Sequence, residues 1–490
     1  MVNDSAPDAR ELSKRSVSRR GFLKVGLGVG AAAALSACSN AAATLIPAAS
    51  TSPAPSLPSG ATPAAVPRGV TGNIDWRQAA GSTINATMIT TQEAEAIKTL
   101  IPDFQALTGI TVNFVQLEQN AQADKLQIEF NSGAGDIDAF QLDFMLLPQF
   151  AISNYLEPLD SYLTNAKYTD ASWYNSGDFL KGVWSAAQWD GKQYAIPMSA
   201  ESSILIYRKD LFDAKSLKVP TTMDEVEAAA KALNNPPTLY GIGNRGLRGQ
   251  GQNVYIWTSF LRGFGGNFFK NYPTDKTPTL DSDAAIQATA FYAKLDKDYG
   301  PPGVANWSNL ETYQGARDGV TAFYIDATPH APLVDDPKTS KTAGKWGVAK
   351  VPAGPAGSFP SIYSHTLAIN AASKNKVAAW LWLLHSTSPA SEHIRSLKTG
   401  DPARTSSFQT DEFKNILGRV GGGTYLDVAV ASMNAADPDF RPRFPGWNQM
   451  GDRIGVAIQS VISGETDATT AMKSCQSDVT TLLKEGGYLS

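Results

Sequence analysis

Hydrophobic residues alternate along the chain between the spacing of strands and the spacing of helices. Residues 84–90 are rich in Ile, Thr and Met and predict a buried strand, and the apolar positions from Ile97 to Leu107 recur on one face of a helix. Gly109 is expected to end this helix, because glycine readily adopts the left-handed conformation that closes many helices. Residues 110–117 then alternate as a second strand.

The same alternation continues to the C-terminus. Because strands separated by helices pair in parallel through crossover connections, this order predicts an α/β fold with a mostly parallel sheet and helices on both faces. Thr222 and Glu225 have the spacing of a capping box at the start of one helix. Further strands are predicted over 139–142 and 203–207, and further helices over 121–131, 222–233, 454–462 and 468–479.

Composition argues against several classes of protein. The chain of 490 residues carries 42 Lys and Arg against 46 Asp and Glu, for a net charge of −4, and no basic block follows residue 24. A nucleic-acid-binding role is therefore disfavoured. Cys38 and Cys475 are the two cysteines and the four histidines are scattered, so we expect neither a disulfide framework nor a metal site.

The first 37 residues have the layout of an export signal. A twin arginine precedes an apolar run over 25–37 that is too short to span a membrane stably. Residues 35–38 (LSAC) resemble a bacterial lipoprotein cleavage site, which would make Cys38 the lipidated first residue. Residues 38–81 begin with an uncharged stretch of Ala, Ser, Thr and Pro and are predicted to form a flexible tether. We therefore expect an extracytoplasmic protein, anchored to the cell membrane by lipid.

The sequence carries no recognised catalytic motif. It contains no Walker loop, no HExxH and no GxSxG. Residues 241–246 match the GxGxxG of dinucleotide sites, but no apolar helix stripe follows and no acidic residue stands about 20 positions further on, so we expect no cofactor. This Gly- and Arg-rich loop, which continues to Gly251, is better interpreted as a flexible surface that approaches a ligand.

Three carboxylates stand where α/β sheets place their ligands. Asp143, Glu201 and Asp326 each lie at or near the end of an apolar stretch, and open sheets bind ligands beyond the ends of their strands. His365, beside Tyr363 and just before a predicted strand, is also expected to face a cleft. These residues are candidates for contact with a polar ligand.

Several stretches resemble a known family. The similarity rests mainly on residues 194–212 (YAIPMSAESSILIYRKDLF) and 368–376 (AINAASKNK), which resemble the extracellular solute-binding proteins of ABC importers. The most similar type is the sugar and polyol group that includes maltodextrin-binding protein. Residues 154–160, 220–225 and 265–266 add to the similarity, which extends from about residue 84 to the C-terminal helices.

The resemblance implies an α/β periplasmic-binding-protein-like fold, with two lobes joined by a hinge that the chain crosses three times. One lobe would comprise residues 82–198 and 328–370, and the other residues 199–327 and 371–490. The lobes would close on a sugar, oligosaccharide or polyol without breaking a bond, so the protein would not be an enzyme. It would be a monomer without a cofactor, and its partners would be the transmembrane subunits of an ABC permease.

The resemblance also places the expected site. Glu201 corresponds to a ligand-contacting glutamate, residues 92–93 fall in the first ligand loop, and residues 252–257 correspond to an aromatic ligand segment. The loop over 245–251 resembles a sugar- and polyol-binding branch more than the maltodextrin branch. The full set of expected ligand-binding residues is Gln92, Glu93, Gln119, Asp143, Glu201, Arg248, Asn253, Tyr255, Trp257, Asp326, Tyr363, His365, Arg404 and Trp447.

Two alternatives are open at this point. An exported carbohydrate-active enzyme could use Asp143 and Glu201 as its acid and base. The same fold could also bind a non-sugar solute such as an oligopeptide, a polyamine or iron. Iron would need converging tyrosines and histidines, for which the sequence shows no spacing, and a polyamine is disfavoured by Arg245, Arg248 and Arg404.

Overall fold

The computed structural model describes residues 71–489 of the chain. The predicted export signal over 1–37, Cys38 and the tether up to residue 70 lie outside the described residues. Within the described part, no helix combines the length and the apolar character needed to cross a membrane.

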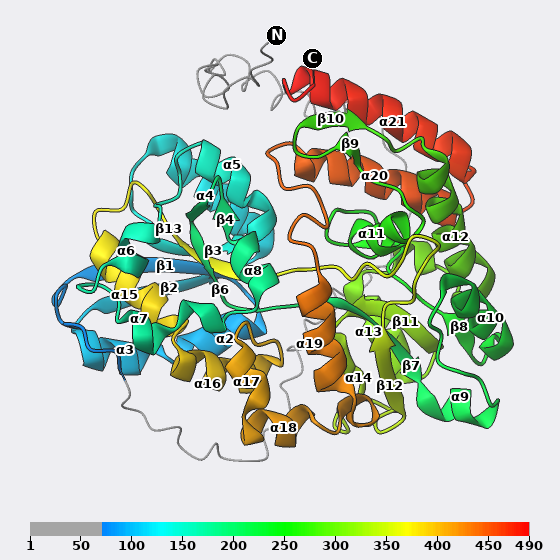
Figure 1. The fold of residues 1–490 in the computed structure, drawn as a ribbon, viewed down its shortest axis with the longest axis horizontal. Helices are drawn as coiled ribbons and strands as arrows, with labels where there is room; N and C mark the ends of the chain where they lie inside the picture. Colours follow the sequence, from blue (N-terminus) through cyan, green and yellow to red (C-terminus); the bar gives the residue numbers. More distant parts are fainter. Residues whose placement is uncertain (1–70, 490) are drawn as a thin grey trace, which may run out of the picture. The chain divides into compact units, whose positions relative to one another are not determined.

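The first sheet has five strands in the order β2-β1-β3-β13-β6 (Figure 1). Strands β1, β2 and β3 pair in parallel, as predicted, whereas β13 runs antiparallel to both β3 and β6. We call this sheet and its helices the first lobe. Its main elements are β1 Thr83–Ile89, α2 Gln92–Lys98, α3 Ile101–Thr108, β2 Thr111–Leu117, α4 Gln119–Ser132, β3 Ala139–Asp143, α5 Leu147–Ile152, α8 Lys181–Ala186, β6 Ala195–Pro197, β13 His365–Ile369, α15 Lys376–Ser386 and α16 Pro389–Thr399.

The second sheet has four strands in the order β12-β7-β11-β8 (Figure 1). Strands β11 and β8 are parallel, and β7 is antiparallel to both β11 and β12. We call this sheet and its helices the second lobe. Its main elements are β7 Ser203–Arg208, α10 Met223–Leu233, β8 Tyr240–Ile242, α11 Asn253–Gly263, α12 Asp283–Tyr299, α13 Asn309–Asp318, β11 Thr321–Ala327, α14 His330–Val334, β12 Trp346–Lys350, α19 Tyr425–Ala435, α20 Trp447–Ile462 and α21 Ala468–Glu485.

Shorter elements complete the described chain. Two hairpins, β4 with β5 and β9 with β10, stand apart from the two main sheets. Their bounds and those of the short helices are α6 Asp160–Thr164, α7 Ala171–Tyr174, β4 Gln188–Trp189, β5 Lys192–Gln193, α9 Lys209–Ala214, β9 Phe269–Asn271, β10 Asp275–Pro278, α17 Thr405–Gln409 and α18 Asp411–Leu417.

Most predicted elements are confirmed, with shifted boundaries. The capping box at Thr222 is present, and Gly109 ends α3 with a φ of 70°. The helix predicted from 97 to 107 is two helices, because the chain breaks at Thr99 and α3 starts afresh with Pro102 in its first turn. The expectation of a mostly parallel sheet is wrong for the second lobe, because β7 runs antiparallel to both its neighbours and only β11 and β8 pair in parallel.

The chain passes between the lobes in three places, from β6 to β7, from β12 to β13 and from α16 to α19. In the first two crossings, Glu201 and Tyr363 exchange backbone hydrogen bonds of 2.9 and 3.0 Å. The buried hydroxyl of Ser202 also donates to the Ser361 carbonyl at 2.7 Å. These two crossings therefore form a hydrogen-bonded ribbon between the lobes.

The lobes differ from the ranges expected from the resemblance. Strand β12 pairs with β7 in the second sheet, although 328–370 was expected in the first lobe. Helices α15 and α16 pack in the first lobe, although 371–490 was expected in the second, and the Trp380 indole donates to the Tyr168 carbonyl at 3.2 Å. The resemblance therefore placed the second and third crossings too early in the chain, before β12 and before α15, because neither the pairing of β12 nor the packing of α15 leaves a local pattern in the sequence.

Residues 71–81, the end of the predicted tether, pack against the first lobe. Trp76 is buried and lies edge-on to Trp173, with 5.7 Å between ring centroids. The backbone N–H of Asn73 donates to the Asp170 carboxylate at 3.0 Å. The tether prediction is therefore wrong for this stretch, because Trp76 supplies apolar surface that the preceding Ala, Ser, Thr and Pro do not.

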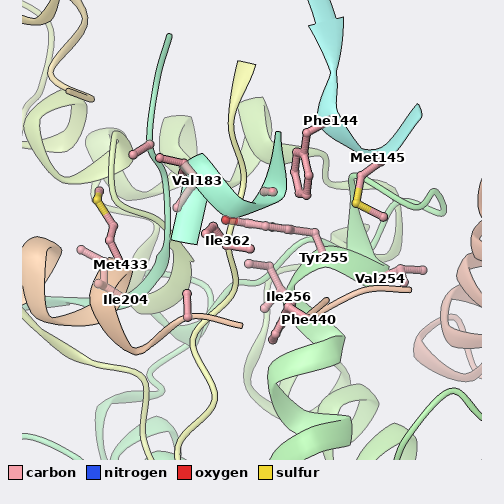
Figure 2. Packing of buried hydrophobic residues seen from close by; sticks show 14 of the residues in the cluster. Phe144, Met145, Val183, Ile204, Val254, Tyr255, Ile256, Ile362, Met433 and Phe440 are labelled. Carbon is pink, nitrogen blue, oxygen red and sulfur yellow. The ribbon is translucent and has the colours of Figure 1, made fainter. Parts of the chain in front are cut away.

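One cluster of buried hydrophobic residues runs through both lobes. Phe144 and Met145, which follow β3 of the first lobe, belong to the same cluster as Tyr255 of α11 in the second lobe (Figure 2). Val183 of α8 and Ile362 of the second crossing are also members. Apolar packing therefore joins the lobes beside the hinge.

Candidate functional site

A cavity of about 390 Å³ is lined by residues of both lobes and of the hinge. The first lobe contributes residues from α2, from the end of β3 and from the start of β13. The second lobe contributes the loop before α11, helices α13 and α14, and a segment between α19 and α20. Concave sites with a few converging polar groups are the usual form of small-ligand sites.

Three carboxylates line this cavity, Glu93, Asp143 and Glu201. Glu93 lies in the first turn of α2, which is capped by the Thr91 hydroxyl. Asp143 ends β3, and one of its oxygens accepts a hydrogen bond from the Met145 N–H at 2.9 Å. Glu201 is fixed by the backbone pairing of the hinge ribbon. Each carboxylate is thus held by a different element, and together they offer several acceptors to ligand hydroxyl groups.

The carboxylates differ in their ionisation. Burial, reinforced by the nearby charge of Glu93, raises the pKa of Glu201 to about 7, against the opposing influence of His365 and Arg245. Burial also acts to raise the pKa of Glu93, but His365 and local hydrogen bonds hold that pKa below its ordinary value. Glu93 is therefore ionised at neutral pH, whereas Glu201 is close to the midpoint of its titration.

Arg245 lines the cavity but its charge is neutralised. Its guanidinium donates to both oxygens of the buried Asp326 and, at 2.8 Å, to the Gly251 carbonyl. Burial alone would raise the pKa of Asp326, but Arg245 and His330 hold it below its usual value. Burial lowers the pKa of His330, which lines the cavity next to this pair, to about 4, so the imidazole is neutral.

Arg441 is a second buried arginine at the cavity. Its Nη1 donates to the Gln250 backbone carbonyl and to the Gln250 side-chain oxygen, both at 2.7 Å. Its Nε and Nη2 are buried and have no partner among the described protein atoms. The guanidinium of Arg441 lies 5.2 Å from the ring centroid of Tyr255, and the guanidinium of Arg245 lies 5.1 Å from the same centroid.

Tyrosines supply most of the aromatic surface of the cavity. Tyr255, Tyr313 and Tyr363 line it, and the hydroxyl of Tyr255 is buried without a partner among the described atoms. Tyr363 lies edge-on to His365, with 5.1 Å between centroids, and the His365 imidazole contacts the Gln141 side-chain amide at 2.8 Å. Such a lining offers both flat apolar faces and hydroxyl groups to a ligand.

No group of three or more His, Cys, Asp or Glu side chains in residues 71–489 is arranged to hold a metal ion.

A sequence profile identifies the family. Residues 90–392, more than half of the chain, match the profile of the bacterial extracellular solute-binding proteins. The chain belongs to this family. As a member of an extracellular family, this solute-binding protein acts outside the cytoplasm.

Individual relatives agree with this assignment. The solute-binding protein is 28% identical over 427 residues to the erythritol/L-threitol-binding protein of Mycolicibacterium smegmatis, with 83% of this chain and 87% of the relative covered. It superposes with a TM-score of 0.70 on an ABC transporter solute-binding protein of Agrobacterium vitis S4 with bound D-mannitol. The two sequences are 27% identical, and the superposition covers 84% of this chain and 100% of the other. The corresponding protein of Agrobacterium radiobacter K84 in complex with ribitol gives a TM-score of 0.73 at 24% identity, with 82% and 99% covered. The chain therefore has the two-lobed fold of ABC transporter solute-binding proteins.

Six of the residues expected from the sequence line the cavity of the solute-binding protein. They come from five separate stretches of chain, which the fold brings together. A seventh, Asp326, lies behind the lining and positions Arg245. The side chains of Gln92 and Gln119 are not among the described parts. The six that line the cavity are Glu93, Asp143, Glu201, Tyr255, Tyr363 and His365.

Trp257 and Arg404 do not line the cavity. Trp257 is fully buried within the second lobe, where its indole N–H donates to the Thr289 hydroxyl at 3.1 Å. Arg404 is fully buried in the first lobe, where it donates to the Thr387 carbonyl and lies 3.9 Å from the Phe179 ring centroid. In both cases the side chain belongs to a lobe core.

Three further expected residues have other roles. Asn253 donates to the carbonyls of Gly246 and Gly455 and so fixes the loop before α11 onto α20. Trp447 donates to the Gln250 side-chain oxygen at 3.2 Å and therefore supports Arg441 from behind. Arg248 is exposed and does not line the cavity.

Sequence reasoning missed several lining residues. Arg245 and Gln250 lie in the Gly- and Arg-rich loop that was interpreted as a ligand-approaching surface, so this loop was a usable signal, although the residue chosen from it, Arg248, does not line the cavity. Arg441 lies in a Pro- and Arg-rich connection without periodicity, and no sequence pattern marked it. The other polar or aromatic lining residues that were missed are Gln252, Asn309, Tyr313, His330 and Thr399.

Proposed function

We propose that this solute-binding protein captures an uncharged polyol or short sugar in the cavity between its lobes and delivers it to an ABC permease. The observation that carries this proposal is the lining, which combines three carboxylates, one arginine with free donors and three tyrosines. Hydroxyl groups donate to carboxylates and accept from arginine, while tyrosine faces cover the C–H groups between them. The ligands named for the relatives, erythritol or L-threitol and D-mannitol, have this chemistry.

The mechanism is closure about the hinge ribbon. Asp143 lies on the first lobe and Arg441 on the second, so a ligand that contacts both stabilises the arrangement in which the lobes are together. Closure of this kind is a common response of two-lobed binding proteins to ligand. The permease would then recognise the closed form and accept the ligand unchanged.

We further propose that the protein is exported, lipidated at Cys38 and monomeric. The twin arginine, the apolar run and the LSAC site that support the first two points lie in the first 38 residues. Mass spectrometry of the protein recovered from bacterial membranes should find a diacylated or triacylated N-terminal Cys38, and Cys38→Ser should release the protein from the membrane fraction. An unmodified N-terminus in the membrane fraction would contradict lipidation.

Thermal melting against a ligand panel tests the proposed function. A ligand that binds only the folded state raises the midpoint, by about 2.7 kcal/mol of stability at 100-fold excess over its dissociation constant. We expect one or a few polyols or sugars to raise the midpoint and to be recovered unchanged. Cleavage of a glycoside would favour the carbohydrate-active enzyme, and a shift with peptides, polyamines or iron alone would favour another solute.

A further inference from the structure

Arg441 is a buried cation whose hydrogen-bonding capacity is only partly used. Its side chain is among the largest fully buried ones in the described chain, yet Nε and Nη2 have no partner there. The charge of Asp143, which lines the same cavity, acts on Arg441, but none of the ion pairs among the described residues includes this arginine. Leaving buried charged donors unpaired is costly, so a cavity built in this way is completed by a ligand that supplies acceptors.

The orientation of Arg441 is fixed from behind. Gln250 accepts two hydrogen bonds from Nη1, and the Gln250 side-chain oxygen accepts a third from the Trp447 indole. Helix α20 has Gly451 at the point where it meets Gln250, and a side chain there would come within 2.5 Å of the Gln250 Cβ. One guanidinium nitrogen, Nη1, is therefore occupied by hydrogen bonds to the protein. The other two, Nε and Nη2, form a fork of two donors in fixed positions.

The charges around the cavity decide what this fork accepts. Arg245 is neutralised by Asp326 and its Nη1 is committed to Gly251, so it offers little to a ligand. The positive charge of Arg441 is outnumbered by the carboxylates Glu93, Asp143 and Glu201, which line the same cavity. A ligand carboxylate or phosphate would approach more negative than positive charge, whereas two neighbouring hydroxyl groups can accept from the fork and donate their protons to a carboxylate.

We propose that Arg441 is the residue that determines ligand class in this cavity, with Nε and Nη2 donating to two adjacent hydroxyl oxygens of an uncharged polyol while Asp143 accepts a hydroxyl proton from the same diol. The inference rests on the proposed function and deepens it, because it assigns to Arg441 and Asp143 the contacts that favour a neutral vicinal diol over the corresponding sugar acid. It also makes the ligand the bridge between Arg441 of the second lobe and Asp143 of the first.

The test compares Arg441→Gln and Arg441→Lys with the matched control Arg248→Gln, which alters an exposed arginine outside the lining. Titration calorimetry would use erythritol, ribitol, D-mannitol and D-glucitol, each beside the aldonate of the same chain length. We expect the wild type to prefer the polyol, Arg441→Gln to weaken binding by about 10- to 100-fold, and Arg248→Gln to change it little. Arg441→Lys should recover only part of the loss, because an ammonium group cannot reproduce the fork.

A deoxy analogue separates direct contact from a structural role. Removing one hydroxyl of the bound diol should weaken binding to the wild type more than binding to Arg441→Gln, because the variant has already lost the contact with Arg441 and retains only the contact with Asp143. Equal losses in both proteins, or equal affinity of Arg441→Gln and Arg248→Gln for the polyol, would overturn the inference and leave the proposed function standing. Tighter binding of the aldonate than of the polyol would overturn the choice of a neutral diol. If the wild type binds no polyol or sugar, the proposed function fails and this inference fails with it.

Discussion

The charged side chains around the cavity differ in whether a protein partner neutralises them. Arg245 and Asp326 form a buried pair, whereas Arg441 and the carboxylates Glu93 and Glu201 face the cavity without such a partner. The paired charges hold neighbouring segments of the site together, and the unpaired ones are the groups that we expect a ligand to contact. Substitutions at the two kinds of position should therefore have different consequences.

Removing the charge of Glu201 should stabilise the unliganded protein at alkaline pH. Its pKa is raised from 4.5 to about 7, so the folded state retains a proton that the unfolded chain has lost, and stability falls as the pH rises through that window. The charged or titratable groups near it include Glu93, Asp326, His365 and Arg245, together with Asp401, Tyr255, Tyr363 and Tyr425 from other segments. Glu201→Gln should exceed the wild type in urea-unfolding free energy by at most about 3 kcal/mol at pH 8, with a smaller difference at pH 5. A variant less stable than the wild type at pH 8 would show that the carboxylate is stabilised by contacts that the structure does not contain.

Removing Asp326 should destabilise the fold, because it leaves the buried Arg245 without a counter-charge. We expect Asp326→Asn to lower the unfolding free energy by about 3 to 5 kcal/mol in urea titrations. Asp213→Asn is the control, since its partner Lys209 and Asp213 itself are 53% and 64% exposed, and it should change stability by less than about 0.5 kcal/mol. Equal effects of the two substitutions would contradict the structural role assigned to the buried pair.

The loop over 245–252 takes its conformation from helix α20. Gly451 and Gly455 are one helical turn apart, and at each position a Cβ would lie 2.5 Å from an atom of this loop. Asn253 adds a hydrogen bond of 2.9 Å to the Gly455 carbonyl. The helix therefore acts as the base on which Arg245 and Gln250 are placed at the cavity.

Gly451→Ala should disturb the site without touching a ligand. The added Cβ would meet the Cβ and Cα of Gln250, which orients Arg441, so we expect a loss of about 1 to 3 kcal/mol of stability together with weaker ligand binding. Asp452→Ala, at the exposed neighbouring position of the same helix, is the control for helix propensity. Unchanged affinity in Gly451→Ala would show that the loop relaxes without moving Arg441.

Individual elements were largely predictable from the sequence, and their partners were not. The period of the apolar residues marks α10, α20 and the strands β1 to β3, because local spacing determines which face of an element can be buried. The assignment of β12 to the second sheet depends on its pairing with β7, about 140 residues away, and leaves no local pattern.

Trp257 was misplaced for a similar reason, since an aromatic residue on α11 has the same local pattern whether it faces the lobe core or the cavity. Asp143 and Glu201 were found because the ends of apolar stretches and the family resemblance both mark them, and Glu93 because the resemblance places it in the first ligand loop, whereas Arg441 lies in an irregular segment.

The two lobes are connected outside the hinge by Arg443, two residues after Arg441. Its Nη1 donates to the Ala186 and Gln188 carbonyls of the first lobe at 2.6 and 3.2 Å, and its Nε donates to Asp439 of its own segment at 2.9 Å. One short stretch of chain therefore contacts the cavity through Arg441 and the opposite lobe through Arg443. We therefore expect ligand binding at Arg441 and the arrangement of the two lobes to influence each other.

Arg443→Gln should weaken ligand binding although Arg443 does not line the cavity. Loss of its hydrogen bonds to the first lobe would favour separated lobes, so we expect the dissociation constant to rise several-fold, up to about 10-fold. Small-angle X-ray scattering of the liganded variant should show a larger radius of gyration than that of the liganded wild type. Arg453→Gln, at an exposed position of α20, is the control and should match the wild type in both measurements.

The most direct test of the central claim is isothermal titration calorimetry of the purified protein with erythritol, ribitol and D-mannitol. We predict saturable binding of at least one polyol with one site per chain, since Glu93, Asp143, Glu201 and Arg441 line one cavity between the lobes. Absence of binding by every polyol and sugar in a wider panel, with binding of a charged solute instead, would contradict the claim that this cavity takes an uncharged polyhydroxy ligand.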